Sequence, residues 1–354
     1  MRIAQIAPLA EAVPPKLYGG TERVISWLTE ALVDLGHDVT LFASGDSTTS
    51  ARLMACTRTG LRLAGINDHT ASLLAMLDRV LRSADRFDIL HFHLDFLHFP
   101  TFRHLADKCL TTLHGRQDLP DFWPAYGAFP ELRLVSISDA QREPIAGARF
   151  AGTVHHGLPS GLIPFSPADR GYLAFIGRIS PEKRPDRAIE IARRCGLKLR
   201  IAAKVDHADL AYFKTRIEPL LDDPLVEFVG EIGDADKPAF LGGARALLFP
   251  IDWPEPFGLV MIEAMAAGTP VVAWRRGSTV EVIEPGASGF LVDSVDEAVA
   301  AVGMAGAIPR GRVRAAFEAR FTADRMARDY IRLYENLLGA ARPALFGKTL
   351  TAAA

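Results

Sequence analysis

Short apolar runs alternate with a helical pattern at the start of the chain. Residues 2–7 are mostly apolar, as in a buried strand. Between residues 21 and 35 the apolar side chains recur every three or four positions, which predicts a helix that Gly36 ends. Residues 39–43 are again apolar. A strand, a helix and a second strand in this order predict a parallel sheet covered by helices.

The same pattern continues along the chain and restarts in its second half. Further strands are predicted at residues 89–92, 109–113, 134–137, 172–177, 199–203, 226–229 and 246–249, and helices at residues 185–195 and 323–338. Residues 157–169, between the two series, hold three prolines and two glycines without periodicity, as expected of a linker. We therefore predict an α/β fold of two Rossmann-like domains, residues 1–160 and 161–322, facing a central cleft.

Length and composition agree with two packed domains. The chain has 354 residues, 49% of them hydrophobic, and a formal net charge of −2 that gives no overall attraction to nucleic acid or to an anionic membrane. No run approaches the ~20 apolar residues of a membrane span, although peripheral membrane contact stays open. Three widely spaced cysteines and a start unlike a signal peptide predict a cytoplasmic protein without a disulfide framework.

The most informative stretch of the chain holds two carboxylates, Glu255 and Glu263, eight residues apart. It follows a predicted strand. Residues 258–267 are rich in helix formers, and Gly268 and Pro270 form a stop signal. Glu255 then lies ahead of a helix whose free N–H groups can hold a phosphate, and Glu263 lies about one and a half turns inside it. A solvated helix face is the alternative from physics alone.

A basic pair follows the first predicted strand of the second domain. Arg178 can form a fork of hydrogen bonds to phosphate oxygens, and Lys183 can add a point charge. Together they could stabilise a diphosphate as it leaves with increasing charge. An isolated pair of this kind is more often a solvated loop, but the position at the same sheet edge as Glu255 favours a site.

Residues 255–271 resemble the signature of retaining GT-B glycosyltransferases of family four (glycosyl transferases group 1). The resemblance rests on Glu255, Phe257-Gly258-Leu259, Glu263 and Gly268-Thr269-Pro270-Val271, and it extends over nearly the whole chain. It implies a GT-B fold whose C-terminal helix, about residues 323–345, crosses back to the first domain. It also implies transfer of a hexose from a nucleotide diphosphate sugar, of the UDP-glucose or GDP-mannose type, to an acceptor hydroxyl, without a cofactor or metal.

The resemblance also implies roles for single residues. Glu255 and the backbone of Phe257, Gly258 and Leu259 would orient the sugar and phosphate, and Glu263 would accept hydrogen bonds from the ribose. In the family's phosphate motif a glycine usually follows the lysine, whereas this chain has Arg184, which puts the shape of that loop in doubt.

Further donor contacts are predicted at loops that follow strands. Lys204 would reach the donor phosphate, and the backbone near Ile232 could meet the nucleotide base. Gly19 and Gly20, after Tyr18, permit close approach of phosphate or sugar at a helix start. A surface lysine and an ordinary turn are the alternatives, and the resemblance is what assigns the two glycines to the donor site.

Histidines and aromatic residues supply the remaining candidates. His114 ends a strand and could position a sugar hydroxyl, with an ordinary loop histidine as the alternative. His91, His93, His98, His155 and His156 suggest a metal site, but no nearby carboxylate completes a cluster, so no metal is predicted. Trp123 and Tyr126, in an aromatic loop, are candidate acceptor contacts, although such residues more often pack the loop itself.

Two other functions fit the same pattern. A nucleotide-sugar epimerase can share this architecture, and product analysis with the donor alone would distinguish it. A catalytically silent sugar-nucleotide binding protein would bind the donor tightly without turnover. The complete set of charged candidates favours the transferase over both.

Overall fold

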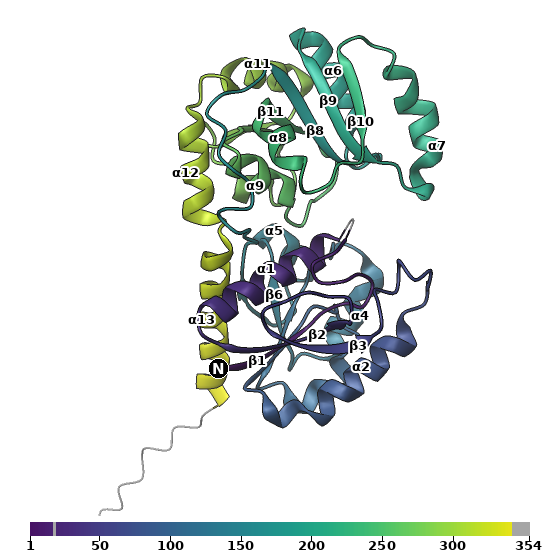
Figure 1. The fold of residues 1–354 in the computed structure, drawn as a ribbon, viewed down its shortest axis with the longest axis vertical. Coiled ribbons are helices and arrows are strands. Elements are labelled where there is room, and N and C mark those ends of the chain that lie inside the picture. The colour runs from purple at the N-terminus through teal and green to yellow at the C-terminus, as the bar shows by residue number, and fades with distance from the viewer. Residues whose placement is uncertain (17–18, 342–354) are drawn as a thin grey trace, which may run out of the picture.

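The computed structural model describes residues 1–16 and 19–341 and contains two parallel β-sheets flanked by helices. The two halves lie one above the other, and the chain passes from the lower to the upper half between β7 and β8 (Figure 1). Among the described residues, no helix has both the length and the apolar content needed to cross a membrane. The predicted α/β architecture is confirmed.

The first sheet has seven strands in the order β3-β2-β1-β4-β5-β6-β7. Their bounds are β1 (Arg2–Ile6), β2 (Asp38–Ser44), β3 (Arg52–Thr57), β4 (Ile89–Phe92), β5 (Cys109–Thr112), β6 (Arg133–Ser136) and β7 (Phe150–Thr153). Strand β1 lies in the middle because its buried side chains pack on both faces, and Ile3 pairs with Val39 on one side and Ile89 on the other.

The second sheet has six strands in the order β10-β9-β8-β11-β12-β13. Their bounds are β8 (Tyr172–Arg178), β9 (Lys198–Lys204), β10 (Val226–Gly230), β11 (Ala244–Phe249), β12 (Val271–Trp274) and β13 (Gly289–Val292). In both sheets the strand order reverses beside the first strand, at β1/β4 and β8/β11. Ligands of open α/β sheets bind at such a reversal, beyond the carboxyl ends of the strands.

Helices cover the two sheets, and α6 begins and ends at the residues that the sequence predicts. Their bounds are α1 (Gly20–Asp34), α2 (Thr70–Arg82), α3 (Phe99–Phe102), α4 (Trp123–Ala128), α5 (Asp139–Arg142), α6 (Pro185–Cys195), α7 (Leu210–Tyr212), α8 (Lys237–Gly242), α9 (Leu259–Ala266), α10 (Thr279–Val282), α11 (Val295–Ala305), α12 (Arg310–Arg320) and α13 (Ala323–Ala341). Helix α6 shows why: Pro185 fits its first position, and Gly196 ends it in a left-handed conformation.

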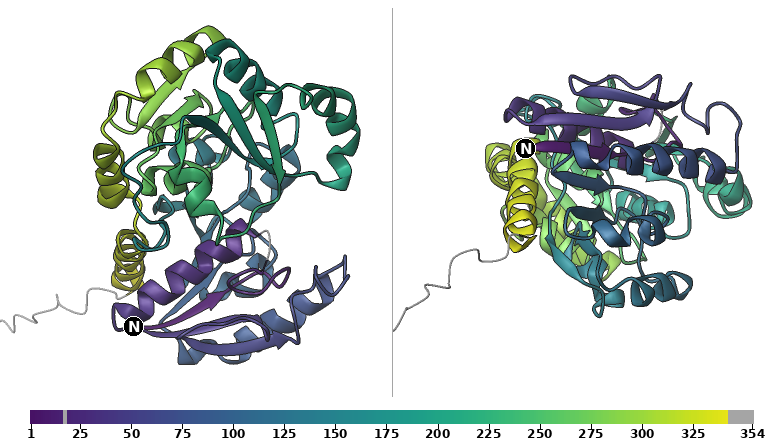
Figure 2. Two further views of the ribbon diagram at one scale, coloured as in Figure 1. Left: turned by 45° about the horizontal axis from the view of Figure 1, so that its top comes forward. Right: turned by 90° about the horizontal axis from the view of Figure 1, so that it is seen from below.

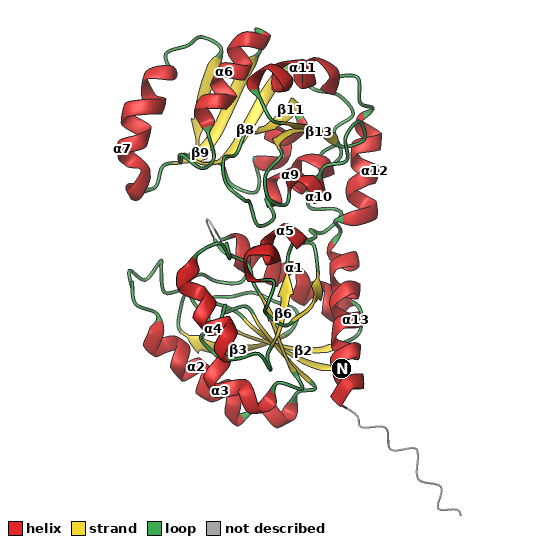
Figure 3. Ribbon diagram, turned by 180° about the vertical axis from the view of Figure 1, so that it is seen from behind, coloured by secondary structure: helices red, strands yellow, loops and turns green. Residues whose placement is uncertain are grey.

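The last helix, α13, returns from the second half and packs against α1 of the first (Figures 2 and 3). Its Tyr330 and Tyr334 are fully buried. The Tyr334 hydroxyl accepts a hydrogen bond from Gln5 Nε2 in β1 at 3.2 Å. The first half therefore contains side chains from both ends of the described chain. The sequence predicts that this helix continues to about residue 345. Residues 342–345 lie outside the described residues.

Candidate active site

The loop after β11 places Glu255 next to the start of α9. Glu255 is 9% exposed. Its Oε2 accepts a hydrogen bond from Trp253 Nε1 at 3.0 Å and forms an ion pair with Lys183 Nζ. Lys183 Nζ also lies 4.9 Å from the centre of the Trp253 ring, a cation–π distance. Glu255 and Lys183, predicted separately from the sequence, are therefore in direct contact.

Neighbouring turns fix the backbone that carries Glu255. Gly258, directly before α9, has φ 78°, a left-handed conformation that favours glycine. A Cβ on Gly277 would lie 2.5 Å from the Glu255 nitrogen, so only glycine fits this close approach. Ser278 N–H donates to the Glu255 carbonyl at 3.0 Å, and Ser278 Oγ donates to the Phe257 carbonyl at 2.8 Å. These contacts hold the loop at the N-terminus of α9.

Arg178 and Lys204 form a second charged group at the ends of two paired strands. They are opposite each other in the register of β8 and β9. Arg178 Nε lies 3.4 Å from Asp209, and Lys204 Nζ lies 2.9 Å from Asp206. Glu182 lies 3.5 Å from Arg178. Both predicted phosphate-binding cations thus have carboxylate neighbours, with which a bound diphosphate would compete.

Arg184 adopts the backbone conformation that a glycine would favour. Its φ and ψ are both 53°, in the left-handed region, and it directly precedes α6. Its side chain is held by Asp186, with Nη2 at 2.8 Å, and by Asp252, with Nη1 at 3.1 Å. The chain therefore forms a left-handed turn at this position despite the missing glycine.

Glu263 has a lysine partner that sequence reasoning missed. Glu263 is 4% exposed, and its Oε1 accepts a hydrogen bond from Lys237 Nζ of α8 at 2.8 Å. Lys237 also lies 3.6 Å from Asp234. Asp234 in turn forms an ion pair with Arg23 of α1. The predicted ribose-binding carboxylate is thus the start of a charge network that reaches the first half.

The starts of α1 and α9 approach each other across the junction between the halves. A Cβ on Gly20 would lie 3.8 Å from Leu259 Cδ1. Gly19 is enclosed, because a Cβ there would lie 2.8 Å from Pro15 Cβ. Tyr18, which precedes these glycines in the sequence, lies outside the described residues. Two helix N-termini, one from each half, therefore border the same space.

His114 lies directly beyond β5 and is linked to the Phe257 loop through His156. The His114 and His156 rings stack with centroids 5.4 Å apart, and the His156 ring lies 4.9 Å from that of Phe257. His114 Nε2 lies 2.8 Å from His93 Nδ1. Burial lowers the pKa of His114 to about 3, so its ring is neutral at pH 7.

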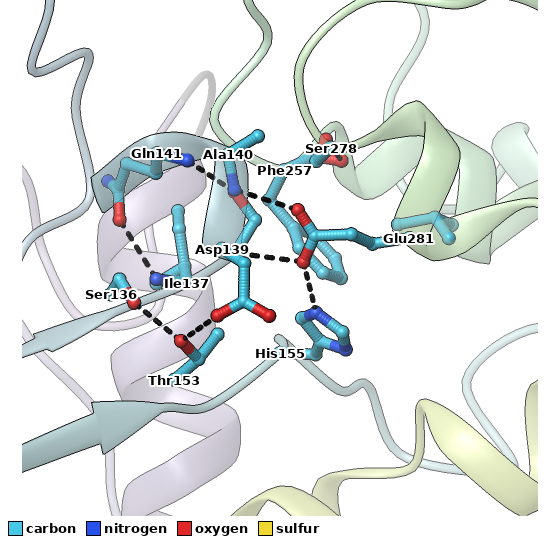
Figure 4. Close-up of polar contacts among 12 residues, drawn as sticks. Ser136, Ile137, Asp139, Ala140, Gln141, Thr153, His155, Phe257, Ser278 and Glu281 are labelled. Atoms are coloured by element: carbon cyan, nitrogen blue, oxygen red, sulfur yellow. Dashed lines mark hydrogen bonds and ion pairs between the residues drawn. The ribbon is translucent and has the colours of Figure 1, made fainter. Parts of the chain in front are cut away.

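Helix α5, whose Gln141 is shown in Figure 4, connects the His114 loop with the loop that carries Glu255. Gln141 Nε2 donates to the carbonyls of Leu113 and Gly115, at 2.9 and 2.7 Å. These carbonyls belong to the residues on either side of His114. Ser138 Oγ donates to the Pro256 carbonyl at 2.7 Å. The two loops that carry candidate residues are therefore fixed to one short helix.

His91 and His98 form hydrogen bonds to hydroxyl groups of the first half, whereas the Nδ1 atoms of His98 and His156 are buried and have no partner among the described residues. His91 lies 2.7 Å from both the Tyr334 and the Thr112 hydroxyls, and His98 Nε2 lies 2.8 Å from the Thr111 hydroxyl. Across residues 1–16 and 19–341, no group of three His, Cys, Asp or Glu side chains is arranged to hold a metal ion. These histidines therefore serve the packing of the first half.

The remaining candidates are Trp123 and Tyr126, which follow β5, and Ile232, which follows β10. Tyr126 is buried and donates to Gln117 Oε1 at 2.5 Å, so it holds its own loop together. Trp123 is 45% exposed, and its Nε1 donates to the Gln117 carbonyl at 3.1 Å. Trp123 is thus the more accessible of the two acceptor candidates. Ile232 follows β10 and is half-buried against the core.

Known proteins resemble the chain along its length. D-inositol 3-phosphate glycosyltransferase from Mycolicibacterium smegmatis is 32% identical over 189 residues, which are 46% of this chain and 40% of that protein. Its namesake from Salinispora arenicola is 31% identical over 248 residues, 64% of this chain and 54% of that protein. Residues 18–143 match the family Glycosyltransferase Family 4, and residues 163–317 match Glycosyl transferases group 1. The chain belongs to the family-four, group 1 glycosyltransferases.

Solved structures confirm the GT-B fold of this family-four protein. Sucrose-phosphate synthase from Thermosynechococcus elongatus superposes with a TM-score of 0.77 at 19% identity, covering 96% of this chain and 99% of that one. Anabaena HepE in complex with UDP-glucose superposes with a TM-score of 0.72 at 18% identity, covering 95% and 100%. By contrast, the chain spans about half of the length of the two curated relatives.

Sequence reasoning missed several residues of the candidate site. Trp253 lies two positions before Glu255, and Lys237 follows a predicted strand, so a survey of all polar residues beyond strand ends would have found both. Gln141 and Glu281 act between segments far apart in sequence. Nothing in their local sequence signals those contacts.

Proposed function

We propose that this protein is a retaining hexosyltransferase that uses a nucleotide diphosphate sugar, of the UDP-glucose or GDP-mannose type, and an acceptor hydroxyl. The observation that carries the proposal is the contact of Lys183 with Glu255 directly ahead of α9. A cation, a carboxylate and free helix N–H groups together suit a sugar diphosphate, because the cation and N–H groups bind phosphate and the carboxylate binds sugar hydroxyls.

The chemistry follows from the charge that develops on the leaving group. When the bond from the anomeric carbon to the phosphate oxygen breaks, its electron pair stays on that oxygen. Lys183 and Arg178 would stabilise this charge more in the transition state than in the bound donor. The acceptor oxygen would attack on the same face and pass its proton to the leaving phosphate oxygen. These cations and N–H groups would act without a divalent metal.

The nucleotide would bind to the second half. Glu263 would accept hydrogen bonds from the ribose, as an alternative partner to Lys237. UDP-glucose is the first donor to test, because a structure of similar fold is known in complex with it. The acceptor stays open: the curated relatives are named for D-inositol 3-phosphate, and the chain spans about half of their length.

Product analysis with UDP-glucose and GDP-mannose, with and without EDTA and with an acceptor panel, tests the proposal. We expect transfer that EDTA leaves unchanged and a product of retained anomeric configuration by NMR. Lys183→Ala should lower kcat/KM about 100-fold, in the range for removal of one transition-state donor. Lys198→Ala, at the exposed start of β9, is the matched control. Epimerised donor, or tight binding without turnover, would refute transfer.

A further inference from the structure

The carboxylate of Glu281 bridges the junction between the two halves (Figure 4). Glu281 lies in α10 of the second half. Its Oε2 accepts hydrogen bonds from Asp139 N–H at 2.8 Å and from His155 Nε2 at 2.9 Å, and its Oε1 accepts one from Ala140 N–H at 2.9 Å. Its side chain is 16% exposed. Both oxygens of one carboxylate are therefore bonded to the first half.

A carboxylate suits this position better than any other side chain. The two backbone N–H groups belong to the start of α5, where no helical carbonyl can accept from them. Three donors converge on two oxygens, and an ionised carboxylate is an acceptor only. Burial raises the pKa of Glu281, but hydrogen bonds from His155, Ala140 and Asp139 outweigh it, so the net pKa is lowered. Glu281 is thus charged at neutral pH.

The helix that Glu281 holds also fixes the predicted sugar-binding loops. From α5, Gln141 holds the carbonyls on both sides of His114, and Ser138 holds the Pro256 carbonyl next to Phe257. On the other side of the junction, Ser278 holds the Phe257 carbonyl and lies three residues before Glu281. The α5 side of Glu281 therefore leads to both loops, and the Ser278 side leads to the second of them.

We propose that Glu281 is a positioning residue that locks the two halves together and holds His114 in register with the loop of residues 255–258. The proposal rests on the function proposed above, in which both loops would bind the same donor sugar. Glu281 does not touch the reacting atoms. Its effect reaches them through Gln141 and Ser138.

Hydrogen exchange tests the lock without any need for turnover. In Glu281→Ala, the amides of Asp139 and Ala140 should lose their acceptor and exchange at least tenfold faster, as measured by mass spectrometry on peptides spanning residues 137–142. Glu284→Ala is the matched control, because Glu284 is exposed three residues further along. Unchanged protection in Glu281→Ala would overturn the proposal. This result stands whether or not the protein transfers sugars, so the two proposals fail separately.

Kinetics test the link to the donor site. In Glu281→Gln, kcat should fall at least tenfold, because the amide presents an NH2 group to backbone donors. The affinity for UDP or GDP, whichever stabilises the wild-type protein, should change less than twofold, because the nucleotide would bind to the second half alone. Equal losses of kcat and nucleotide affinity would show that Glu281 supports the second half itself and would overturn the positioning role. Glu284→Gln should change neither quantity.

Discussion

At the scale of single residues, His114 is one end of a hydrogen-bond chain that leads inward to α13. Gln5 Nε2 donates to the Tyr334 hydroxyl, so Gln5 Oε1 faces His93 Nε2, at 2.8 Å. Burial lowers the pKa of His93 well below its usual value, and the neutral ring carries one N–H. His93 Nε2–H therefore donates to Gln5, and His93 Nδ1 accepts from His114 Nε2–H.

This chain predicts one tautomer for His114, with the proton on Nε2 and a lone pair on Nδ1. Nδ1 is buried and has no hydrogen-bond partner among the described residues. A buried lone pair without a partner is tolerated better than a buried N–H. Long-range 15N–1H NMR spectra, assigned with a His114→Gln variant, should show His114 protonated at Nε2 only. A proton on Nδ1 would contradict the prediction.

Two variants separate this effect from general loss of packing. Gln5→Leu removes the acceptor of His93 and should give His114 a mixture of both tautomers. Thr111→Val breaks the bond between His98 and Thr111, a buried histidine–hydroxyl pair in the same half, and should leave His114 unchanged.

At the scale of elements, the backbone at the start of α6 is in an unfavourable conformation, and ion pairs offset its free-energy cost. Arg184 is left-handed, which costs a non-glycine residue about 1–2 kcal/mol. Arg184→Ala and Arg184→Gly both remove the pairs with Asp186 and Asp252, but only glycine relieves the backbone. We expect the glycine variant to be more stable than the alanine variant by about 1 kcal/mol, measured by urea unfolding.

Arg187, inside α6, is the control for that comparison. Its backbone is helical, where glycine costs about 1 kcal/mol relative to alanine. Arg187→Gly should therefore be less stable than Arg187→Ala, the reverse of the order at Arg184. If the glycine variant were less stable than the alanine variant at position 184 as well, the left-handed turn would not be present in solution.

Most strands that sequence reasoning predicted contain a buried apolar run, and β10, which has no fully buried position, is the exception. Strands β4 and β5 are buried at every position and were found within one residue of their bounds. Strand β3 is nowhere buried, and β7 (Phe-Ala-Gly-Thr) is only half-buried, so neither has a run that stands out. Pairing with a neighbouring strand, rather than composition, makes both segments strands.

At the scale of the whole molecule, four buried histidines and the half-buried His114 predict sensitivity to acid. Burial lowers the pKa of His98 and His114 to about 3, and that of the other three well below 6.5. In the unfolded chain these imidazoles have a pKa near 6.5. Below that pH the unfolded state therefore binds more protons than the folded state. Below pH 6.5, each histidine should lower the free energy of unfolding by about 1.4 kcal/mol per pH unit.

Thermal unfolding between pH 7.5 and 5.0 measures this effect. Tm should fall steeply below pH 6.5. His98→Asn should make the slope shallower by about one proton, whereas His104→Gln, which changes an exposed histidine, should leave the slope unchanged. A constant Tm over this range would mean that the histidines are accessible to protons in the folded state.

How much of the site can be predicted depends on whether its contacts stay within one half. Glu255 and Lys183 both follow strands of the second sheet, so their shared edge follows from the topology and was predicted, whereas their direct contact was not. The contacts of Glu281 and Ser138 depend on how the halves are oriented, which no local pattern encodes. Arg184 is intermediate, because its replacement of a glycine was visible but its conformation was not.

The return of α13 also fixes the order in which the chain can mature on the ribosome. The first half is synthesised first, yet Gln5 and His91 find their hydrogen-bond partner in Tyr334, more than 240 residues further along. Until α13 emerges, these buried polar groups lack that partner. The sheet of the second half is built from consecutive segments, so it can form without a segment that is synthesised much later. The half that is made first should therefore be the last to reach its native state.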